Sequence, residues 1–352
     1  MKMEESTAGM AASGNGTSGS GKTEWHFNLL VSTFFLAVVA GGLFSCNHGE
    51  SAAGNEGKPL NMEAVVESKN AFAMDIYGQV RSEKDNLFLS PYSISSALAM
   101  VYAGARGETA AQMAQTLNFP TRSGTVHEAF GDLQDRLNAV QEKEEVQLRI
   151  ANGLWPQADY PFREEYIRLI ETNYDAKTES VDYKTAAEAI RKQINAWVAE
   201  KTAGKIEDLI PQGVLDSLTR LVLVNAIYFK GDWVHTFSTD RTRDMPFHLS
   251  ATETVEVPTM IQKEDFGYAD LDTLQVLAMP YAGERMSMIV LLPKETGGLP
   301  ALEGSLTAGQ LAEWSQNLMD KEVWVYFPRF KVEAKFRLEK MLARMGMPSA
   351  FT

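Results

Sequence analysis

The sequence predicts an α+β fold, in which helices come first along the chain and mainly antiparallel strands follow. Apolar residues recur at helical spacing in the first part of the folded region, from residue 61 to beyond residue 109. Later segments alternate between apolar and polar residues, and two of them, 276–281 and 286–292, flank a short turn typical of a hairpin. A doubly wound parallel sheet would instead alternate strands with helices, so that class is not favoured.

Composition allows a large core and excludes several partners. The chain has 352 residues, of which 45% are hydrophobic, which fits one large domain or two smaller ones. It carries a formal net charge of −13 and no basic run, so nucleic acid is not an expected partner. Cys46 is the single cysteine, which rules out an intramolecular disulfide.

The N-terminal region differs in composition from the rest of the chain. Residues 1–27 are rich in Gly, Ser and Thr, residues 28–44 are largely apolar, and residues 47–58 return to Gly, Asn, Glu and Ser. This order is typical of an export signal followed by a tether. We therefore expect a signal segment at 1–46, a flexible tether at 47–60 and a folded domain from 61.

The apolar run ends in Leu43-Phe44-Ser45-Cys46, which resembles the lipobox of bacterial lipoprotein signals. In that case Cys46 is acylated and anchors an exported protein to the cell envelope, at the outer membrane or the cell surface. The alternative is ordinary signal cleavage near Ala40, which leaves the thiol of Cys46 free and the protein extracellular. A permanent membrane-spanning helix is less favoured, because the run is short for a tilted span.

A phosphate-binding loop pattern, G-x-x-x-x-G-K-[ST], occurs at residues 16–23. Such a loop needs a buried strand before it and a helix after it within a parallel α/β unit. Here a Gly- and Ser-rich stretch precedes the pattern and a signal-like segment follows it. Nucleotide binding is therefore not expected.

Helix signals dominate the start of the folded domain. Phe72, Ile76 and Val80 have the spacing of one helix face and predict a helix ending near residue 82. A short apolar strand is expected from residue 86. It leads into Ser90-Pro91, a serine N-cap with proline at the first helical position, and the helix that follows should stop at Gly104. The sequence Thr109 to Gln112 has capping-box spacing and predicts the next helix.

Strand signals dominate the later part. The sequence predicts strands at 148–155, 255–260, 276–281, 286–292 and 323–330, with a turn at 282–285. Between them, an amphipathic helix carries Ile190, Ile194, Trp197 and Val198 and is expected to end near Gly204. A last helix is expected over 338–345, capped by Gly346.

Residues 221–233, LVLVNAIYFKGDW, predict a strand that is apolar on both faces and so lies within a covered sheet. On one of these two faces, Asn225 is a polar residue among apolar ones. A buried amide without partners costs about 1–3 kcal/mol, so another segment should supply a donor and an acceptor for it.

Several long segments together resemble the serpin family of protease inhibitors, over about residues 70–351. The segments that carry the resemblance are 86–113, 194–211, 221–233, 276–293 and 325–333, with Phe237, Thr242 and Phe247 spaced between them. The resemblance implies a serpin-like fold, with N-terminal helices packed on a large, mainly antiparallel sheet and smaller sheets beside it.

The resemblance also implies roles for individual residues. In serpins, a Ser-Pro-x-Ser turn lies beneath the central strand of the large sheet and bonds to its asparagine, in a region called the shutter. This assigns Ser90, Pro91, Ser93 and Asn225 to a shutter. Trp233 and Thr242 then match the upper end of that sheet, called the breach, where loop insertion begins.

Each of these roles has a plainer alternative. Ser90 and Pro91 fit simple helix capping, Asn225 fits an ordinary satisfied core amide, and Trp233 fits a packing residue.

The function implied is inhibition of serine or cysteine endopeptidases, in which a cleaved reactive loop inserts into the large sheet. Serpins continue beyond the segment that matches residue 351 with a last strand of the large sheet, a hinge, the reactive loop and final strands. We therefore expect residues 61–352 to be a partial, inactive serpin domain, truncated from a longer inhibitor. The shutter histidine of the family falls in the same later part, and none of the five histidines is assigned to it.

Other functions find less support in the sequence. The alternative is a non-inhibitory binding or scaffold lipoprotein with the same fold. Enzymatic activity is not expected, because the sequence lacks H-E-x-x-H and G-x-S-x-G motifs and paired cysteines, and no metal or cofactor site is predicted.

Overall fold

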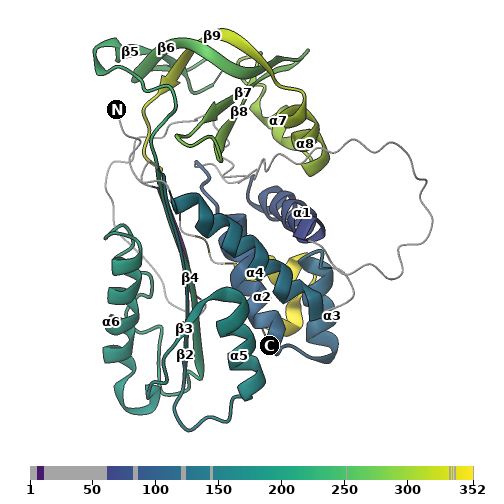
Figure 1. The fold of residues 1–352 in the computed structure, drawn as a ribbon, viewed down its shortest axis with the longest axis vertical. Coiled ribbons are helices and arrows are strands. Elements are labelled where there is room, and N and C mark those ends of the chain that lie inside the picture. Colours follow the sequence, from purple (N-terminus) through teal and green to yellow (C-terminus); the bar gives the residue numbers. More distant parts are fainter. Residues whose placement is uncertain are drawn as a thin grey trace, which may run out of the picture.

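The computed structural model describes residues 6–11, 62–81, 86–119, 124–142, 146–250, 252–332, 334, 336 and 338–351. Within them, two β-sheets lie end to end along the long axis of the molecule, and helices pack on both faces of the lower one (Figure 1). The predictions for Cys46, the tether at 47–60 and the phosphate-loop pattern fall outside the described residues.

The predicted helices of the N-terminal part are confirmed, and the structure adds two that the sequence did not predict, α4 and α5. In chain order they are α1 (Met62–Val80), α2 (Pro91–Gly104), α3 (Gly107–Thr116), α4 (Gly124–Asn138), α5 (Glu164–Tyr174) and α6 (Tyr183–Lys201). Helices α2, α4 and α5 lie on one side of the lower sheet, and α6 lies on the other (Figure 1).

Two details of this region were predicted wrongly. Residues 86–90 form no strand, since no other described strand pairs with them and the chain runs directly into the Ser90 N-cap. Helix α3 begins at Gly107, before the predicted capping box at Thr109, and its N-cap Arg106 makes no side-chain capping bond.

The first sheet has the strand order β1-β4-β2-β3, formed by β1 (Ser6–Ala11), β4 (Leu221–Gly231), β2 (Val146–Pro156) and β3 (Ala176–Thr178). Strands β2 and β4 are antiparallel along their whole length, from Val146 opposite Gly231 to Pro156 opposite Leu221. Both strands were predicted from their apolar sequences, and the antiparallel pairing agrees with the predicted α+β class.

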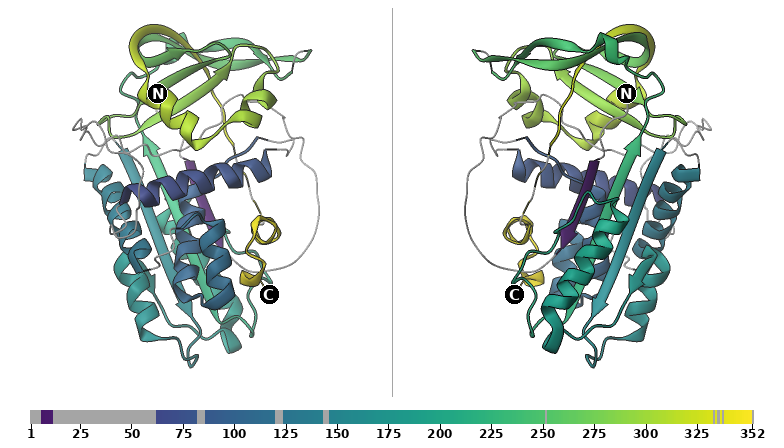
Figure 2. Two further views of the ribbon diagram at one scale, coloured as in Figure 1. Left: turned by 90° about the vertical axis from the view of Figure 1, so that its right-hand side faces the viewer. Right: turned by 90° about the vertical axis from the view of Figure 1, so that its left-hand side faces the viewer.

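Strand β1 was not predicted from the sequence, in which residues 1–46 are expected to be a signal segment. Ser6–Ala11 runs antiparallel to β4, with Ser6 opposite Phe229 and Ala11 opposite Val224. Figure 2 shows it as the purple strand beside β4. The six residues carry no apolar alternation, so a local strand preference does not account for this pairing.

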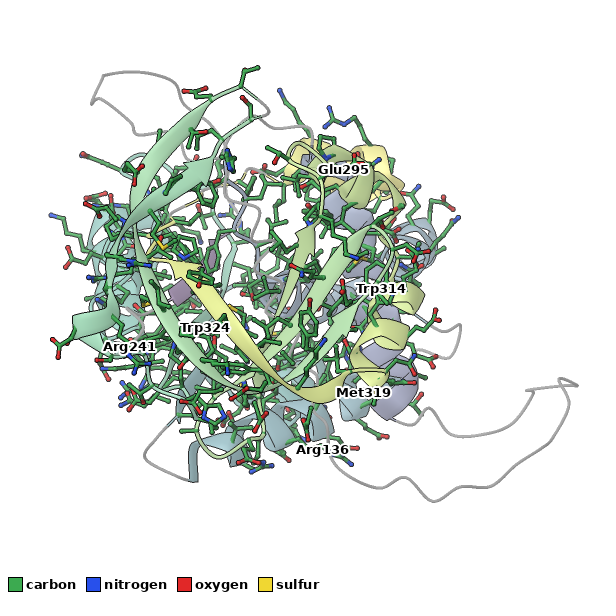
Figure 3. All side chains as sticks on the ribbon, turned by 90° about the horizontal axis from the view of Figure 1, so that it is seen from above. Arg136, Arg241, Glu295, Trp314, Met319 and Trp324 are labelled. Carbon is green, nitrogen blue, oxygen red and sulfur yellow. The ribbon has the colours of Figure 1, made fainter. Side chains whose placement is uncertain are left out.

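The second sheet contains β5 (Arg243–His248), β6 (Thr254–Asp270), β7 (Leu274–Pro280), β8 (Ser287–Pro293) and β9 (Met319–Pro328). The predicted hairpin is confirmed, since β7 and β8 pair antiparallel and the turn between them holds Gly283 and Glu284 at positive φ. Strand β9 pairs with β6 and carries the exposed side chains of Met319 and Trp324, seen from above in Figure 3.

The remaining elements are short helices. They are α7 (Leu299–Ser305), α8 (Ala308–Gln316) and α9 (Glu339–Met345), with 3-10 turns at Ala139–Glu142, Thr239–Arg241 and Pro348–Ala350. Helix α9 ends at Gly346 with φ 126°, as the sequence predicts. Among the described residues, no helix is long and apolar enough to cross a membrane.

Strand β4 is covered on both faces, as its sequence predicts. Val222, Val224 and Ala226 are buried against the apolar side of α6. The opposite face, which carries Asn225, lies over α2. The polar groups on that second face therefore have to find partners within the protein.

Candidate functional site

Asn225 is fully buried, with 0% of its surface exposed, and its side chain uses both ends of its amide. Its Oδ1 accepts a hydrogen bond from the Ser93 hydroxyl on α2. Its Nδ2 donates to Asn152 Oδ1 on β2 at 2.7 Å. The prediction that another segment supplies a donor and an acceptor for this amide is confirmed.

The hydrogen bonds continue from Asn152 into the helices. Asn152 Nδ2 donates to Gln134 Oε1 at 3.0 Å and to the Tyr174 carbonyl oxygen at 2.7 Å, and Gln134 Nε2 donates to that same carbonyl at 3.0 Å. We call Ser93, Asn225, Asn152, Gln134 and Tyr174 the buried amide network. It links two neighbouring strands, β2 and β4, to α2, α4 and the last residue of α5.

The two serines of the predicted shutter have different roles. Ser93 bonds to Asn225, as the resemblance implies. Ser90 does not, because its hydroxyl accepts the backbone N–H of Ser93 at 3.3 Å and caps α2, with Pro91 at the first helical position. Ser90 and Pro91 therefore cap α2 and position Ser93 on the first turn of the helix, and the shutter role of these residues stays a prediction.

The two predicted breach residues lie apart from this network. Trp233 is buried, with 4% exposure, and its ring stacks on Tyr281 with centroids 4.5 Å apart. A single β-bridge between the same two residues connects the end of β4 to the end of β7. Thr242 directly follows the 3-10 turn Thr239–Arg241 and is half-buried. Trp233 thus lies at the junction of the two sheets, and the breach role of both residues stays a prediction.

Sequence reasoning missed Asn152, Gln134 and Tyr174. Asn152 shows the same signal as Asn225, a lone amide within an apolar strand, LRIANGLW, and could have been found by it. Gln134 and Tyr174 carry no such signal, since polar residues are common on helices and Tyr174 contributes a backbone carbonyl.

His127 extends the network through the Tyr174 side chain. Its Nδ1 lies 2.7 Å from the Tyr174 hydroxyl, and only 5% of the residue is exposed. Burial lowers the pKa of the His127 imidazole from 6.5 to about 4 and raises the pKa of the Tyr174 hydroxyl. The imidazole is therefore neutral at pH 7.

This burial predicts a loss of stability in acid. The unfolded chain binds a proton at His127 below about pH 6.5, whereas the folded chain binds it only below about pH 4. The free energy of unfolding should therefore fall as pH drops through this window, by up to about 3 kcal/mol. Urea unfolding of the protein and of H127Q at several pH values measures this, and the variant should show a shallower slope. An equal slope in both proteins would mean that His127 does not titrate in this way.

The chemistry of the network is structural and not catalytic. Amides, a hydroxyl and a carbonyl hold each other in place, and none of them is positioned as a nucleophile beside a general base. Within the part of the chain that the structure describes, no group of three or more His, Cys, Asp or Glu side chains could hold a metal ion. The network can hold two strands of a sheet onto the helices beneath them. Its bonds must be broken or remade if those strands move.

The amino-acid sequence is also similar to those of known proteins, all from one family. The family model described as serpin (serine protease inhibitor) matches residues 67–352. Leukocyte elastase inhibitor of Bos taurus is 42% identical over 301 residues, which cover 83% of this chain and 79% of that protein. Human Serpin B3 is 40% identical over 310 residues, covering 82% and 79% of the two chains.

Solved structures show the same fold. Ovalbumin from emu (Dromaius novaehollandiae) matches with a TM-score of 0.79 and 31% identity, over 82% of this chain and 79% of that one. The structure of cleaved Serpin 42Da matches with a TM-score of 0.76 and 35% identity, over 83% and 78% of the two chains. The family model covers most of the chain, and both of these sequence relatives are at least 40% identical to it. The chain therefore belongs to the serpin family and has the α+β serpin fold.

Proposed function

We propose that this protein inhibits serine or cysteine endopeptidases by inserting a cleaved reactive loop as a new strand beside β4. The observation that carries the proposal is the hydrogen bond from Ser93 to Asn225, which ties β4 to a helix directly beneath it. The names of its relatives, among them leukocyte elastase inhibitors, support a protease as the partner.

In this mechanism the protease attacks the reactive loop and forms an acyl-enzyme. The cleaved loop then inserts into the first sheet and carries the bound protease with it, which distorts the protease before water hydrolyses the acyl-enzyme. Insertion adds about ten ladder hydrogen bonds at about 1 kcal/mol each, a sum of the order of a whole domain's stability.

Strand β4 has the edge that such an insertion needs. On one side it pairs with β2 along its whole length. On the other side it pairs with the six-residue strand β1, which comes from a distant part of the chain. A strand that accepts a separate segment at this edge can accept a loop of similar length, since main-chain groups provide most of the recognition.

Incubation with proteases tests the proposal. Protein produced from the complete reading frame should form a covalent complex with leukocyte elastase that survives boiling in detergent, seen as a band of summed mass on a gel. A serine protease blocked at its nucleophile is the control and should give no such band. Absence of a complex across a panel of serine and cysteine proteases would reject the proposal and favour the non-inhibitory scaffold.

We further propose that the protein is exported and acylated at Cys46, on the basis of the residues Leu43 to Cys46. A C46S variant should then lose incorporation of a labelled fatty acid and leave the membrane fraction. Equal labelling of both proteins would reject acylation at this residue.

A further inference from the structure

Lys69 on α1 is a buried amine that has no polar partner among the described residues. Only 7% of the residue is exposed, and its Nζ makes no hydrogen bond. The Nζ atom lies 3.8 Å from the centre of the Tyr92 ring and 4.9 Å from the centre of the Phe130 ring. These rings belong to α2 and α4, which pack beside α1 (Figure 1). The three helices therefore enclose the amine.

Two hydroxyl groups on α2 also lack a partner in the described part of the chain. Tyr92 Oη and Ser96 Oγ are both enclosed, and neither forms a hydrogen bond of normal geometry. Ser96 follows Tyr92 by one helical turn, so the two side chains lie on the same face of α2. Burial raises the pKa of the Tyr92 hydroxyl, and the nearby Ser96 hydroxyl offsets this in part. The amine and the two hydroxyls therefore form one cluster, in which every group can donate a hydrogen bond.

The two aromatic rings do not compensate a buried ammonium group. A cation over a ring gains about 2 kcal/mol when it is desolvated, whereas burying an ion costs several kcal/mol. Burial lowers the pKa of the Lys69 amine well below its ordinary value of 10.5, and no neighbouring carboxylate opposes this. An anion beside Nζ would act in the opposite direction and keep the amine charged.

The cluster is closed off within the three helices. Solvent reaches none of its three polar atoms, and Ser96 is 0% exposed. A segment added to the surface of the domain therefore does not reach the amine. A water molecule can accept these hydrogen bonds but carries no charge. A small anion meets both needs.

We propose that Lys69, Tyr92 and Ser96 form a binding site for one small monovalent anion, such as chloride, between α1, α2 and α4. The ammonium group supplies the opposite charge, and the two hydroxyls donate hydrogen bonds to the same ion. Tyr92 directly precedes Ser93, so the ion also steadies the first turn of α2, from which Ser93 bonds to Asn225. The site does not depend on the proposed inhibition of proteases.

A chloride titration tests whether the folded protein binds the ion. Urea unfolding is measured on protein from the complete reading frame while chloride replaces gluconate at constant ionic strength, so that screening does not change. Between 0 and about 0.5 M chloride, the equilibrium constant for unfolding should fall at least about 5-fold, because the ion binds only the folded state. In K69M it should change less than about 2-fold, since methionine fills the space and needs no partner.

Two further variants separate this site from general effects of salt. K192M removes an exposed positive charge on α6 and should keep the full chloride response. Y92F keeps the ring and removes one hydroxyl, so the chloride concentration at half effect should rise about 10-fold or more. Chloride responses of equal size in K69M and the unchanged protein would overturn the proposal.

Crystals soaked in bromide locate the ion directly. An anomalous scattering peak should lie in contact with Lys69 Nζ and Tyr92 Oη, and crystals of K69M should lack it. Absence of the peak from crystals of the unchanged protein would overturn the proposal. The cluster would then consist of an uncharged amine and hydroxyls that bind water.

Discussion

Replacing Asn225 with alanine should lower the free energy of unfolding by about 3 kcal/mol, since it leaves buried groups unpaired and opens a small cavity. The Ser93 hydroxyl loses its acceptor and Asn152 Oδ1 loses its donor. Both partners are almost fully buried, with 2% exposure each, so water cannot replace the lost amide. Urea unfolding followed by circular dichroism measures the effect.

A matched control is N317A. Asn317 is exposed at the end of α8, and its Nδ2 donates to the Glu313 carbonyl at 2.8 Å. Water can replace this bond, so the change should stay within about 0.5 kcal/mol. A double-mutant cycle of N225A with N152A should also give a coupling of about 1 kcal/mol or more, because the two residues bond directly. Equal, small effects of N225A and N317A would contradict the role given to the network.

Replacing Gly153 with alanine should be as severe, at about 3 kcal/mol or more, because the site has no room for a methyl group. A Cβ at this position would lie 2.3 Å from two ring atoms of Trp155 and 3.2 Å from Trp197. The Trp155 ring is 1% exposed and packs edge-to-face against Trp197, with centroids 5.0 Å apart. The indole can move only by disturbing the core between β2 and α6.

Gly78 provides the control for this substitution. It is exposed within α1, and a Cβ there would meet nothing within 4 Å. G78A should stabilise the protein by about 0.5–1 kcal/mol, since alanine favours a helix over glycine. Thermal unfolding of both variants, together with the emission maximum of tryptophan fluorescence, distinguishes the effects. A melting temperature for G153A equal to that of the unchanged protein would show that the indole has room to move.

The central strand and its amide were predictable because their signal is local. Residues 221–231 alternate between two covered faces, and a single amide among apolar residues must have partners wherever the strand lies. The prediction that Ser93 is a partner of Asn225 came from the resemblance to serpins and not from residue spacing. By sequence, its neighbour Ser90 fits both a helix cap and a shutter residue, and only the structure shows that its hydroxyl caps α2.

Other elements could not be predicted from local sequence. The partners Gln134 and Tyr174 lie on helices far from β4 along the chain, so only the packing brings them together. Strand β1 has no periodicity of its own, so its pairing with β4 carries no local signal. By contrast, the helix start at Thr307 has a full capping box with Gln310, a signal that was present in the sequence and was missed.

Hydrogen exchange at β4 tests the proposed insertion most directly. The measurement uses the protein produced from the complete reading frame. After reaction with elastase, exchange of the backbone amides of residues 224–229 should slow by at least about 10-fold, since a new strand then pairs with them. A covalent complex that forms while these amides exchange as fast as before would show that the loop does not insert beside β4.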